Sequence, residues 1–201
     1  MWTLLTTGGI LLVLIFGKFN EGGWVTLLIT GGVIAPRADT MFERQLAIQE
    51  KQDFLRTMLL SDPRGSVNAA VNLVTPAIDP AADFGMIVIE SDNYPPMSGS
   101  NLMCTVTVVL ETGMIPMQYP VTELCVDTPA GLVRVRAECE GGKCRRVSFH
   151  NVPSFVMHRE ASVEMPGLGT VPVDAAYGGM IYAIGHHCAD QWSGLAHRRL
   201  L

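Results

Sequence analysis

Hydrophobic residues follow a helical spacing in the middle of the chain, between a Pro-Pro pair and a glycine. The apolar positions recur at spacings of four, three and one residues: Leu102, Val106, Val109 and Leu110. This spacing is typical of a helix that is buried on one or more faces. The pattern therefore predicts a helix that begins near Ser98 and ends at Gly113, with Ser98, Ser100 and Asn101 as candidate N-cap residues.

A second helical pattern covers about residues 41–60. Thr40 and Glu43 have the spacing of a capping box, which predicts the start of this helix. One apolar face is expected to pack against the core: Leu46, Phe54, Leu55, Met58 and Leu59. The polar residues between them, Gln45 included, are expected to face solvent.

Short β-type runs fill most of the remaining chain. Strands are predicted over residues 24–30, 67–74, 84–90, 122–127, 132–138, 145–151, 155–157, 163–173 and 180–184. The strand at 84–90 leads directly to Ser98, so the start of the central helix lies on rigid elements. Strands around a central helix predict an α+β fold.

The N-terminal residues 1–17 carry no charge, and residues 10–16 are continuously apolar. This run is shorter than the roughly 20 apolar residues that a spanning helix needs. It also lacks the basic start and small-residue cleavage site of a signal peptide. A buried strand, a weak signal anchor and a segment foreign to the rest of the fold remain open, and the β-branched content favours the strand.

Composition narrows the functional classes. The chain has 201 residues with 48% hydrophobic and 16% charged residues, and its net charge of −5 argues against a nucleic-acid partner. Five cysteines occur without a Cys-x-x-Cys pair, and Cys104 and Cys125 read as small buried hydrophobes. Cys139 and Cys144 flank a Gly-Gly turn, where a cross-strand disulfide is geometrically feasible, although we expect reduced thiols and a cytoplasmic protein.

The start of the central helix is the candidate site. The first amide N–H groups of a helix lack partners within the helix and carry partial positive charge, which suits a carboxylate or phosphate. Gly99 would let a ligand approach the backbone closely. The alternative is an ordinary capped helix without a ligand.

Residues 97–101 (Met-Ser-Gly-Ser-Asn), followed by residues 107–113, resemble the first active-site motif of the proline racemase family. The commonest form of that motif is Met-Cys-Gly-His-Gly, so Ser98 stands at the catalytic Cys position and Ser100 at the His position. Further short motifs extend the resemblance over roughly residues 25–184. The resemblance implies one lobe of a two-lobed, diaminopimelate-epimerase-like fold over residues 24–184, with divergent segments at 1–23 and 185–201.

The resemblance also implies a chemistry. The family removes a proton from Cα of proline or hydroxyproline without a cofactor, as racemases, 4-hydroxyproline 2-epimerases or trans-3-hydroxy-L-proline dehydratases. Ser98 is then the catalytic candidate, and Gly99, Ser100 and Asn101 are the candidates for binding an imino-acid substrate. A hydroxyl is a far weaker base than a thiolate near neutral pH, which favours an acid, water-positioning or shuttle role for Ser98.

The sequence differs from the family pattern in two ways, and these differences suggest an alternative to an active enzyme. Asn20 and Trp24 replace an expected His and Glu, and the second catalytic motif, similar to Asp-Arg-Ser-Pro-Cys-Gly-Thr-Gly, does not occur in the chain. The chain is therefore either an enzyme of hydroxyproline metabolism or a truncated, inactive family member or binding protein. A homodimer would add a second helix N-terminus but not that motif. The histidines at 186, 187 and 197 lack the spacing of a metal site, and we expect no metal and no membrane span.

Overall fold

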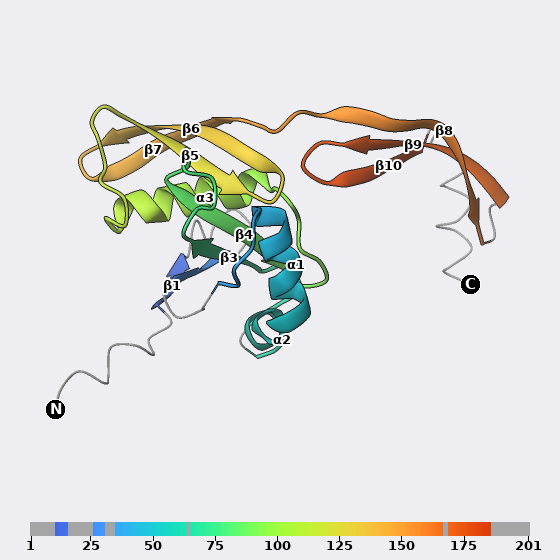
Figure 1. Ribbon diagram of the computed structural model, residues 1–201, viewed down its shortest axis with the longest axis horizontal. Helices are drawn as coiled ribbons and strands as arrows, with labels where there is room; N and C mark the ends of the chain where they lie inside the picture. Colours follow the sequence, from blue (N-terminus) through green and yellow to red (C-terminus); the bar gives the residue numbers. More distant parts are fainter. Residues whose placement is uncertain (1–10, 16–25, 31–34, 64, 167–168, 186–201) are drawn as a thin grey trace, which may run out of the picture. The chain divides into compact units, whose positions relative to one another are not determined.

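The computed structural model describes residues 11–15, 26–30, 35–63, 65–166 and 169–185 (Figure 1). The chain forms two compact units, Met1–Val152 and Pro153–Leu201. The range 24–184, expected to form one lobe, is thus shared between two units. The residues at 20 and 24 and the histidines of the tail lie outside the described part of the chain.

The first unit contains a seven-stranded mixed sheet in the order β1-β2-β3-β4-β5-β6-β7. Its strands are β1 (Leu11–Ile15), β2 (Thr26–Thr30), β3 (Ala70–Thr75), β4 (Phe84–Glu90), β5 (Val121–Thr128), β6 (Gly131–Glu140) and β7 (Lys143–His150). Pairing is parallel between β2 and β3 and between β4 and β5, and antiparallel elsewhere. The apolar N-terminal run does form a strand, β1, as its β-branched content predicted.

The sheet curves around the central helix α3 (Gly99–Glu111), which contacts β2 and β3 on one side and β7 on the other. Figure 1 shows α3 between the β5–β7 layer and the β3–β4 layer. The four apolar positions that predicted this helix are all at most 2% exposed. Gly113 follows the helix with φ +74°, a backbone conformation that favours glycine, so both the span and the end of α3 are confirmed.

Helices α1 (Met41–Lys51) and α2 (Phe54–Leu60) cover the other face of β3 and β4. The core between them is formed chiefly by Ile48, Leu55 and Leu59 from the helices and by Val71, Leu73, Ile87 and Ile89 from the strands. The capping box is present: the Thr40 side chain accepts from the Glu43 amide, and the Glu43 side chain accepts from the Thr40 amide. The sheet therefore has helices on both faces, which buries β3 and β4 almost completely.

Three expectations for this helical region were wrong. The single helix over 41–60 is two helices, because Gln52 ends α1 with non-helical dihedral angles (φ −133°, ψ 20°). Gln45 is buried, since it hydrogen-bonds to a loop carbonyl beyond β4. Leu46 and Phe54 are instead 46% and 59% exposed. Within α1 the buried positions are Met41, Arg44, Gln45 and Ile48, so the expected face was wrong even before the break.

The second unit is a three-stranded antiparallel sheet in the order β10-β9-β8. Its strands are β8 (Phe155–Met165), β9 (Gly169–Tyr177) and β10 (Ile181–Gly185). The predicted strand over 163–173 is therefore wrong, because the chain reverses between β8 and β9, with Gly169 at φ +76°. The ring of Tyr177 packs against that of Phe155 across this sheet, with centroids 5.2 Å apart.

Candidate active site

Ser98 occupies the N-cap position of α3 but does not cap it. Its backbone is extended (φ −138°, ψ 119°), and its side chain makes no hydrogen bond to the first-turn amides. The first backbone bond of the helix runs from the Leu102 amide to the Ser98 carbonyl, at 2.9 Å. Among the described residues, no side chain hydrogen-bonds to the amides of residues 99–101. These three N–H groups therefore have no capping side chain as a partner.

The Ser98 hydroxyl is held in place by its neighbours. Asn101 Nδ2 donates to Ser98 Oγ at 2.9 Å, and the hydroxyls of Ser98 and Ser100 lie 3.4 Å apart. Asn101 is 7% exposed, whereas Ser98 is half-buried and Ser100 is exposed. Because Asn101 occupies one lone pair of the Ser98 oxygen, the hydroxyl is weakened as a base and remains able to donate its proton. The structure thus brings all four predicted site residues together on one helical turn.

Gly99 lies directly against an aromatic ring from β7. A Cβ placed on Gly99 would come within 2.8 Å of Phe149 Cζ, closer than ordinary packing permits. Glycine at this position lets the start of α3 and β7 approach each other, so the first turn is fixed against the sheet. Phe149 was missed by sequence reasoning, because no local pattern reports which strand residue meets a helix start.

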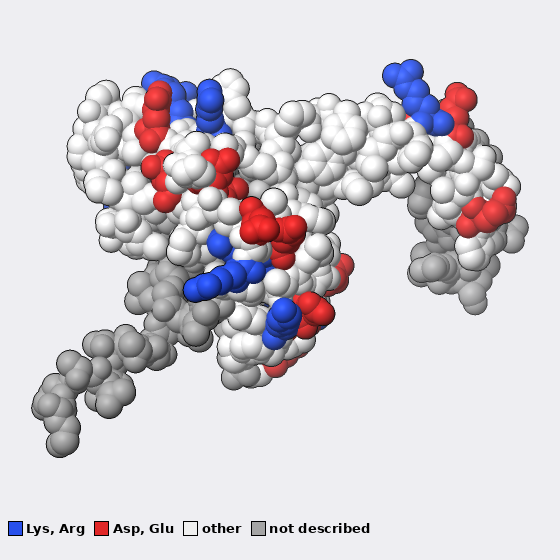
Figure 2. Space-filling model, viewed as in Figure 1, with Lys and Arg blue, Asp and Glu red and all other residues white. Residues whose placement is uncertain are grey.

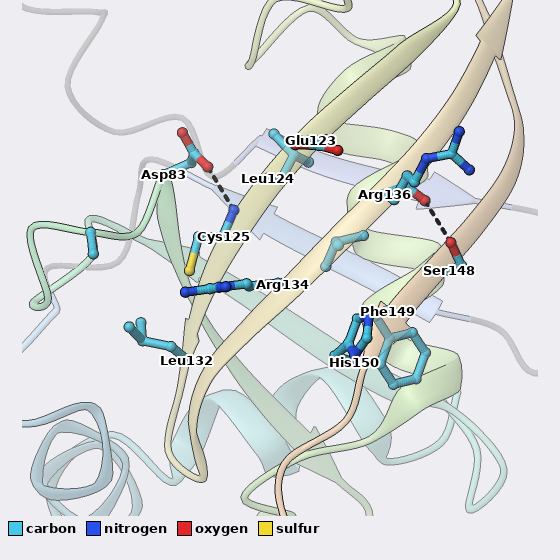
Figure 3. A pocket seen from close by; sticks show the side chains of 12 residues that line it. Asp83, Glu123, Leu124, Cys125, Leu132, Arg134, Arg136, Ser148, Phe149 and His150 are labelled. Carbon is cyan, nitrogen blue, oxygen red and sulfur yellow. Dashed lines mark hydrogen bonds between the residues drawn. The ribbon is translucent and has the colours of Figure 1, made fainter.

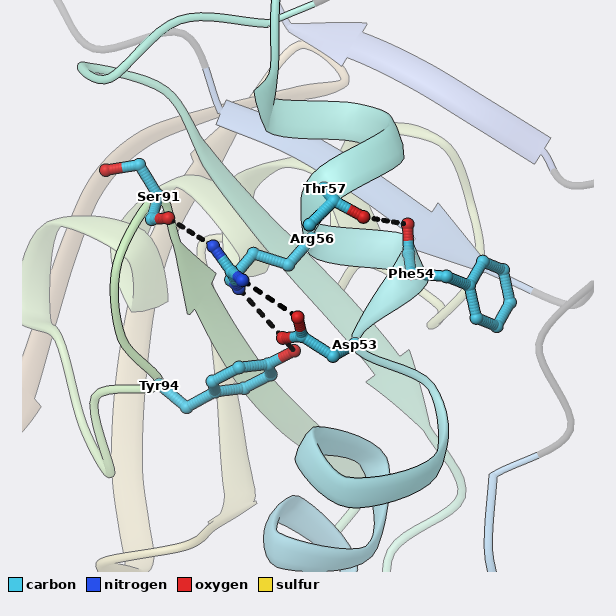
Figure 4. Close-up of polar contacts among 6 residues, drawn as sticks. All are labelled: Asp53, Phe54, Arg56, Thr57, Ser91 and Tyr94. Atoms are coloured by element: carbon cyan, nitrogen blue, oxygen red, sulfur yellow. Dashed lines mark hydrogen bonds and ion pairs between the residues drawn. The ribbon is translucent and has the colours of Figure 1, made fainter.

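The segment that leads into Ser98 is clamped by α1 and α2. Gln45 Nε2 donates to the Tyr94 carbonyl at 2.9 Å, and the Tyr94 hydroxyl donates to Asp53 Oδ1 at 2.8 Å. Arg56 makes two hydrogen bonds of 2.8 Å to the same carboxylate and donates to the Ser91 carbonyl (Figure 4). Gln45 and Tyr94 are 49 residues apart in the sequence, so this contact is evident only in the folded chain.

This clamp has an expected pH signature. Hydrogen bonds from Arg56, and then from Tyr94, lower the pKa of Asp53 below its ordinary value of 3.8. A carboxylate whose pKa is lower in the folded than in the unfolded state stabilises the fold at any pH above the unfolded-state pKa. This contribution declines below that pKa and is lost as the pH falls through the folded-state pKa. We expect Asp53→Asn to lower the melting temperature at neutral pH, and the difference from wild type to shrink steadily below about pH 4. Thermal unfolding followed by circular dichroism across this range measures it.

The control for that experiment is Asp92→Asn, which changes an exposed carboxylate in the adjacent turn. Among the described residues it accepts no hydrogen bond, so its substitution should leave the melting temperature nearly unchanged throughout the pH range. An Asp53→Asn difference that stayed constant into acid would contradict the assigned role of the carboxylate.

A hollow of about 570 Å³ lies over β5, β6 and β7. Figure 3 shows Glu123, Arg134, Arg136 and His150 around it, with Asp83 Oδ2 accepting from the Cys125 amide at 2.7 Å. Phe149, which lies against Gly99, also lines this hollow. None of residues 98–101 lines it, so the hollow is distinct from the helix start at Ser98.

The surface charges are mixed. Figure 2 shows acidic and basic side chains interspersed over the first unit on the face in view, so this face offers no single-sign patch for a polyanion. Nowhere in the described ranges do three or more His, Cys, Asp or Glu side chains converge as a metal site would require. None of the helices within those ranges has the length and apolarity of a membrane span.

Comparison with known proteins decides the family. The proline racemase family model matches residues 19–196. The chain belongs to the proline racemase family. This assignment confirms the resemblance carried by the motif at residues 97–101, and the strands around a central helix confirm the expected α+β fold.

Two solved structures of this family are similar to the chain. One is a hydroxyproline epimerase from Agrobacterium vitis with bound trans-4-hydroxy-L-proline, at 37% identity and TM-score 0.72. The other is a probable proline racemase from Agrobacterium radiobacter K84 with bound carbonate, at 36% identity and TM-score 0.73. Each match covers 80% of this chain and 48% of the other, so the chain spans about half the length of either relative.

Proposed function

We propose that the start of α3 binds the carboxylate of proline or hydroxyproline, and that the family reaction catalysed there is proton exchange at Cα. Support comes from the family membership and from a relative whose structure holds trans-4-hydroxy-L-proline. The other relative holds carbonate, a small planar anion of comparable oxygen geometry. The observation that carries the proposal is the uncapped helix start with a hydroxyl beside it.

The proposed binding mode follows from the first turn of α3. The amides of Gly99 and Ser100 would donate to the carboxylate oxygens, where the helix dipole contributes about 0.3–1 kcal/mol for an exposed anion. The same amides would stabilise the negative charge that spreads onto the carboxylate when Cα loses its proton. No cofactor is needed for this stabilisation. Ser100, which is exposed, would face the ring substituents.

Ser98 acts in this proposal as a proton donor. Asn101 donates to the Ser98 oxygen, so that oxygen is a poor acceptor for a Cα proton while its own proton remains free. To invert the centre, an acceptor on the opposite face of the ring must take the Cα proton; in the family this is the Cys of the second motif, and Ser98 would return a proton from its own face. We propose 4-hydroxyproline 2-epimerisation as the reaction to which this site belongs. The alternative is dehydration of trans-3-hydroxy-L-proline, in which the same acceptor takes the Cα proton and Ser98 protonates the leaving 3-hydroxyl.

A second candidate function is binding without turnover. It is favoured by one observation: Asn101 Nδ2 donates to the Ser98 oxygen at 2.9 Å, which makes the hydroxyl at this site a poor acceptor for a proton. A site whose hydroxyl cannot take the Cα proton would hold the imino acid and exchange that proton slowly or not at all.

Deuterium exchange separates the two functions. The purified chain is incubated in D₂O with trans-4-hydroxy-L-proline or trans-3-hydroxy-L-proline, and the Cα proton signal is followed by NMR together with the epimer or the Δ1-pyrroline product. Titration calorimetry measures binding in parallel. Exchange with one substrate supports the catalytic proposal, and binding without exchange supports the second candidate. Absence of binding to either imino acid and to proline overturns both.

A further inference from the structure

Two thiols face each other at the tip of the β6–β7 hairpin, away from Ser98. Cys139 and Cys144 are cross-strand partners, separated by a turn whose glycines have φ +57° and +78°. Cys139 is 4% exposed and Cys144 is half-buried, and both are free thiols. The pair is independent of the proposed imino-acid site.

The backbone hydrogen bonds show what kind of pair this is. The Cys139 amide donates to the Pro120 carbonyl at 2.8 Å, and the Cys144 amide donates to Glu111 Oε1 at 3.0 Å. Neither amide bonds to the opposite residue, so the two cysteines form a non-hydrogen-bonded pair. In such pairs the Cα atoms lie about 4.5 Å apart, closer than in hydrogen-bonded pairs. The register shifts between Glu138 and Cys139, so the pair lies on the turn side of this irregularity. Disulfides span Cα separations of roughly 4.4–6.8 Å, a range that includes the separation typical of such pairs.

We propose that Cys139 and Cys144 form a reversible disulfide site, oxidised by a low-molecular-weight disulfide such as oxidised glutathione. The more exposed Cys144 thiolate attacks one sulfur of the oxidant, forming a mixed disulfide and releasing one glutathione. The Cys139 thiolate then attacks the Cys144 sulfur and releases the second glutathione. Two protein thiols are oxidised, one glutathione disulfide is reduced, and the two thiol protons end on the two released glutathiones.

The surroundings fit this order of events. Cys139 is buried, and its Sγ lies within weak hydrogen-bond distance of Thr122 Oγ1 and of the Ala137 carbonyl, 3.6 Å from each. Cys144 is instead half-buried, so it is the more accessible of the two thiols to an oxidant from solution. Burial raises the pKa of the Cys144 thiol, so exchange is expected to be slow at neutral pH and faster at mildly alkaline pH.

The bond would also affect the far end of α3. Glu111, at the last turn of that helix, accepts from Lys143 Nζ at 2.6 Å as well as from the Cys144 amide. The β7 side of the hairpin tip is therefore tied to the end of α3 through the Glu111 carboxylate. Locking β6 to β7 at this point would restrain the same hairpin in the unfolded chain, which is the usual source of disulfide stabilisation.

Peptide mapping tests the site. The whole chain is equilibrated with reduced and oxidised glutathione at mildly alkaline pH, alkylated, unfolded and digested with trypsin without reduction. Lys143 lies between the two cysteines, so cleavage yields the peptides 137–143 and 144–145, which stay joined only if the proposed disulfide has formed. We expect this cross-linked pair to be the main disulfide product, and the melting temperature to rise by about 4 °C on oxidation and fall again on reduction.

Two variants complete the test. Cys144→Ser should abolish both the cross-linked peptide and the shift in melting temperature, whereas Cys104→Ser, at a half-buried thiol on α3, should leave both unchanged. The mapping of the unmodified chain needs no variant to fold. The proposal is overturned if residues 139 and 144 are alkylated throughout the glutathione series, or if disulfides involving Cys104 or Cys125 form to the same extent.

Discussion

Replacing Ser98 with alanine is expected to lower the rate of Cα deuterium exchange by about 10²-fold or more, because a positioned proton donor contributes at least that factor to proton transfer. The variant removes only the hydroxyl that Asn101 orients, and the first-turn amides remain. Binding of trans-4-hydroxy-L-proline should therefore persist within a few-fold while exchange falls. NMR exchange rates and calorimetric dissociation constants, measured on the same samples, separate the two effects.

Two comparisons make the Ser98 result specific. Ser148→Ala makes the same chemical change on the opposite face of β7, where the hydroxyl donates to the Arg136 carbonyl, and should leave exchange unchanged. Ser98→Cys restores the group most common at this position in the family and, since a thiol ionises far more readily than a hydroxyl, should retain or raise exchange. Equal exchange by wild type and the alanine variant would remove Ser98 from the mechanism.

The central helix and its two ends could be predicted from the sequence, because the residues that determine them are close together in the chain. Apolar spacing, the preceding prolines and the glycine at the end all act within a few residues, so α3 and β4 match their predicted spans. The position of Ser98 at the helix start follows from the same signals. The buried face of β6 could not be assigned in this way, because the adjacent Leu132 and Val133 are both apolar; the structure buries Val133, Val135 and Ala137 and leaves Leu132 exposed.

The parts that sequence reasoning missed depend on contacts between distant segments. Gln45 is buried at a hydrogen bond to the segment before Ser98, 49 residues away in the chain. The reversal between β8 and β9 was predicted as one strand over residues 163–173, since a glycine between apolar runs fits either a bulge or a turn. The contact between Gly99 at the start of α3 and Phe149 on β7 also joins distant segments, so the helical pattern could not predict it.

The junction between the two halves of the large sheet depends on one buried carboxylate. Strands β4 and β5 are paired only through Phe84 with Val126 and Gly85 with Asp127. Asp127, 6% exposed, uses Oδ2 to accept from the amides of Ile78 and Asp79, both at 2.9 Å. These bonds hold the connection from β3 to β4 against the end of β5, where the ladder itself is shortest.

Arg44 reinforces the same junction from α1. It is 9% exposed and donates to the Thr75 hydroxyl at 3.2 Å and to the Pro76 carbonyl at 2.6 Å. Burial lowers the pKa of the guanidinium, and the negative charge of Asp127 opposes that shift. The carboxylate is therefore both the acceptor for two buried amides and a favourable charge for a buried cation.

We expect Asp127→Ala to destabilise the first unit by about 3 kcal/mol, because it leaves two amides without an acceptor and a buried cation without a nearby opposite charge. Urea unfolding followed by fluorescence measures the loss as a lower midpoint. Asp127→Asn, which keeps an acceptor oxygen and removes the charge, should lose less, and Glu123→Ala, at an exposed carboxylate on the same strand, should change stability by less than about 0.5 kcal/mol. If Asp127→Ala and Glu123→Ala unfold at the same urea concentration, the Asp127 carboxylate does not hold the junction, and the hydrogen bonds between Asp83 and Cys125 and apolar packing stabilise it instead.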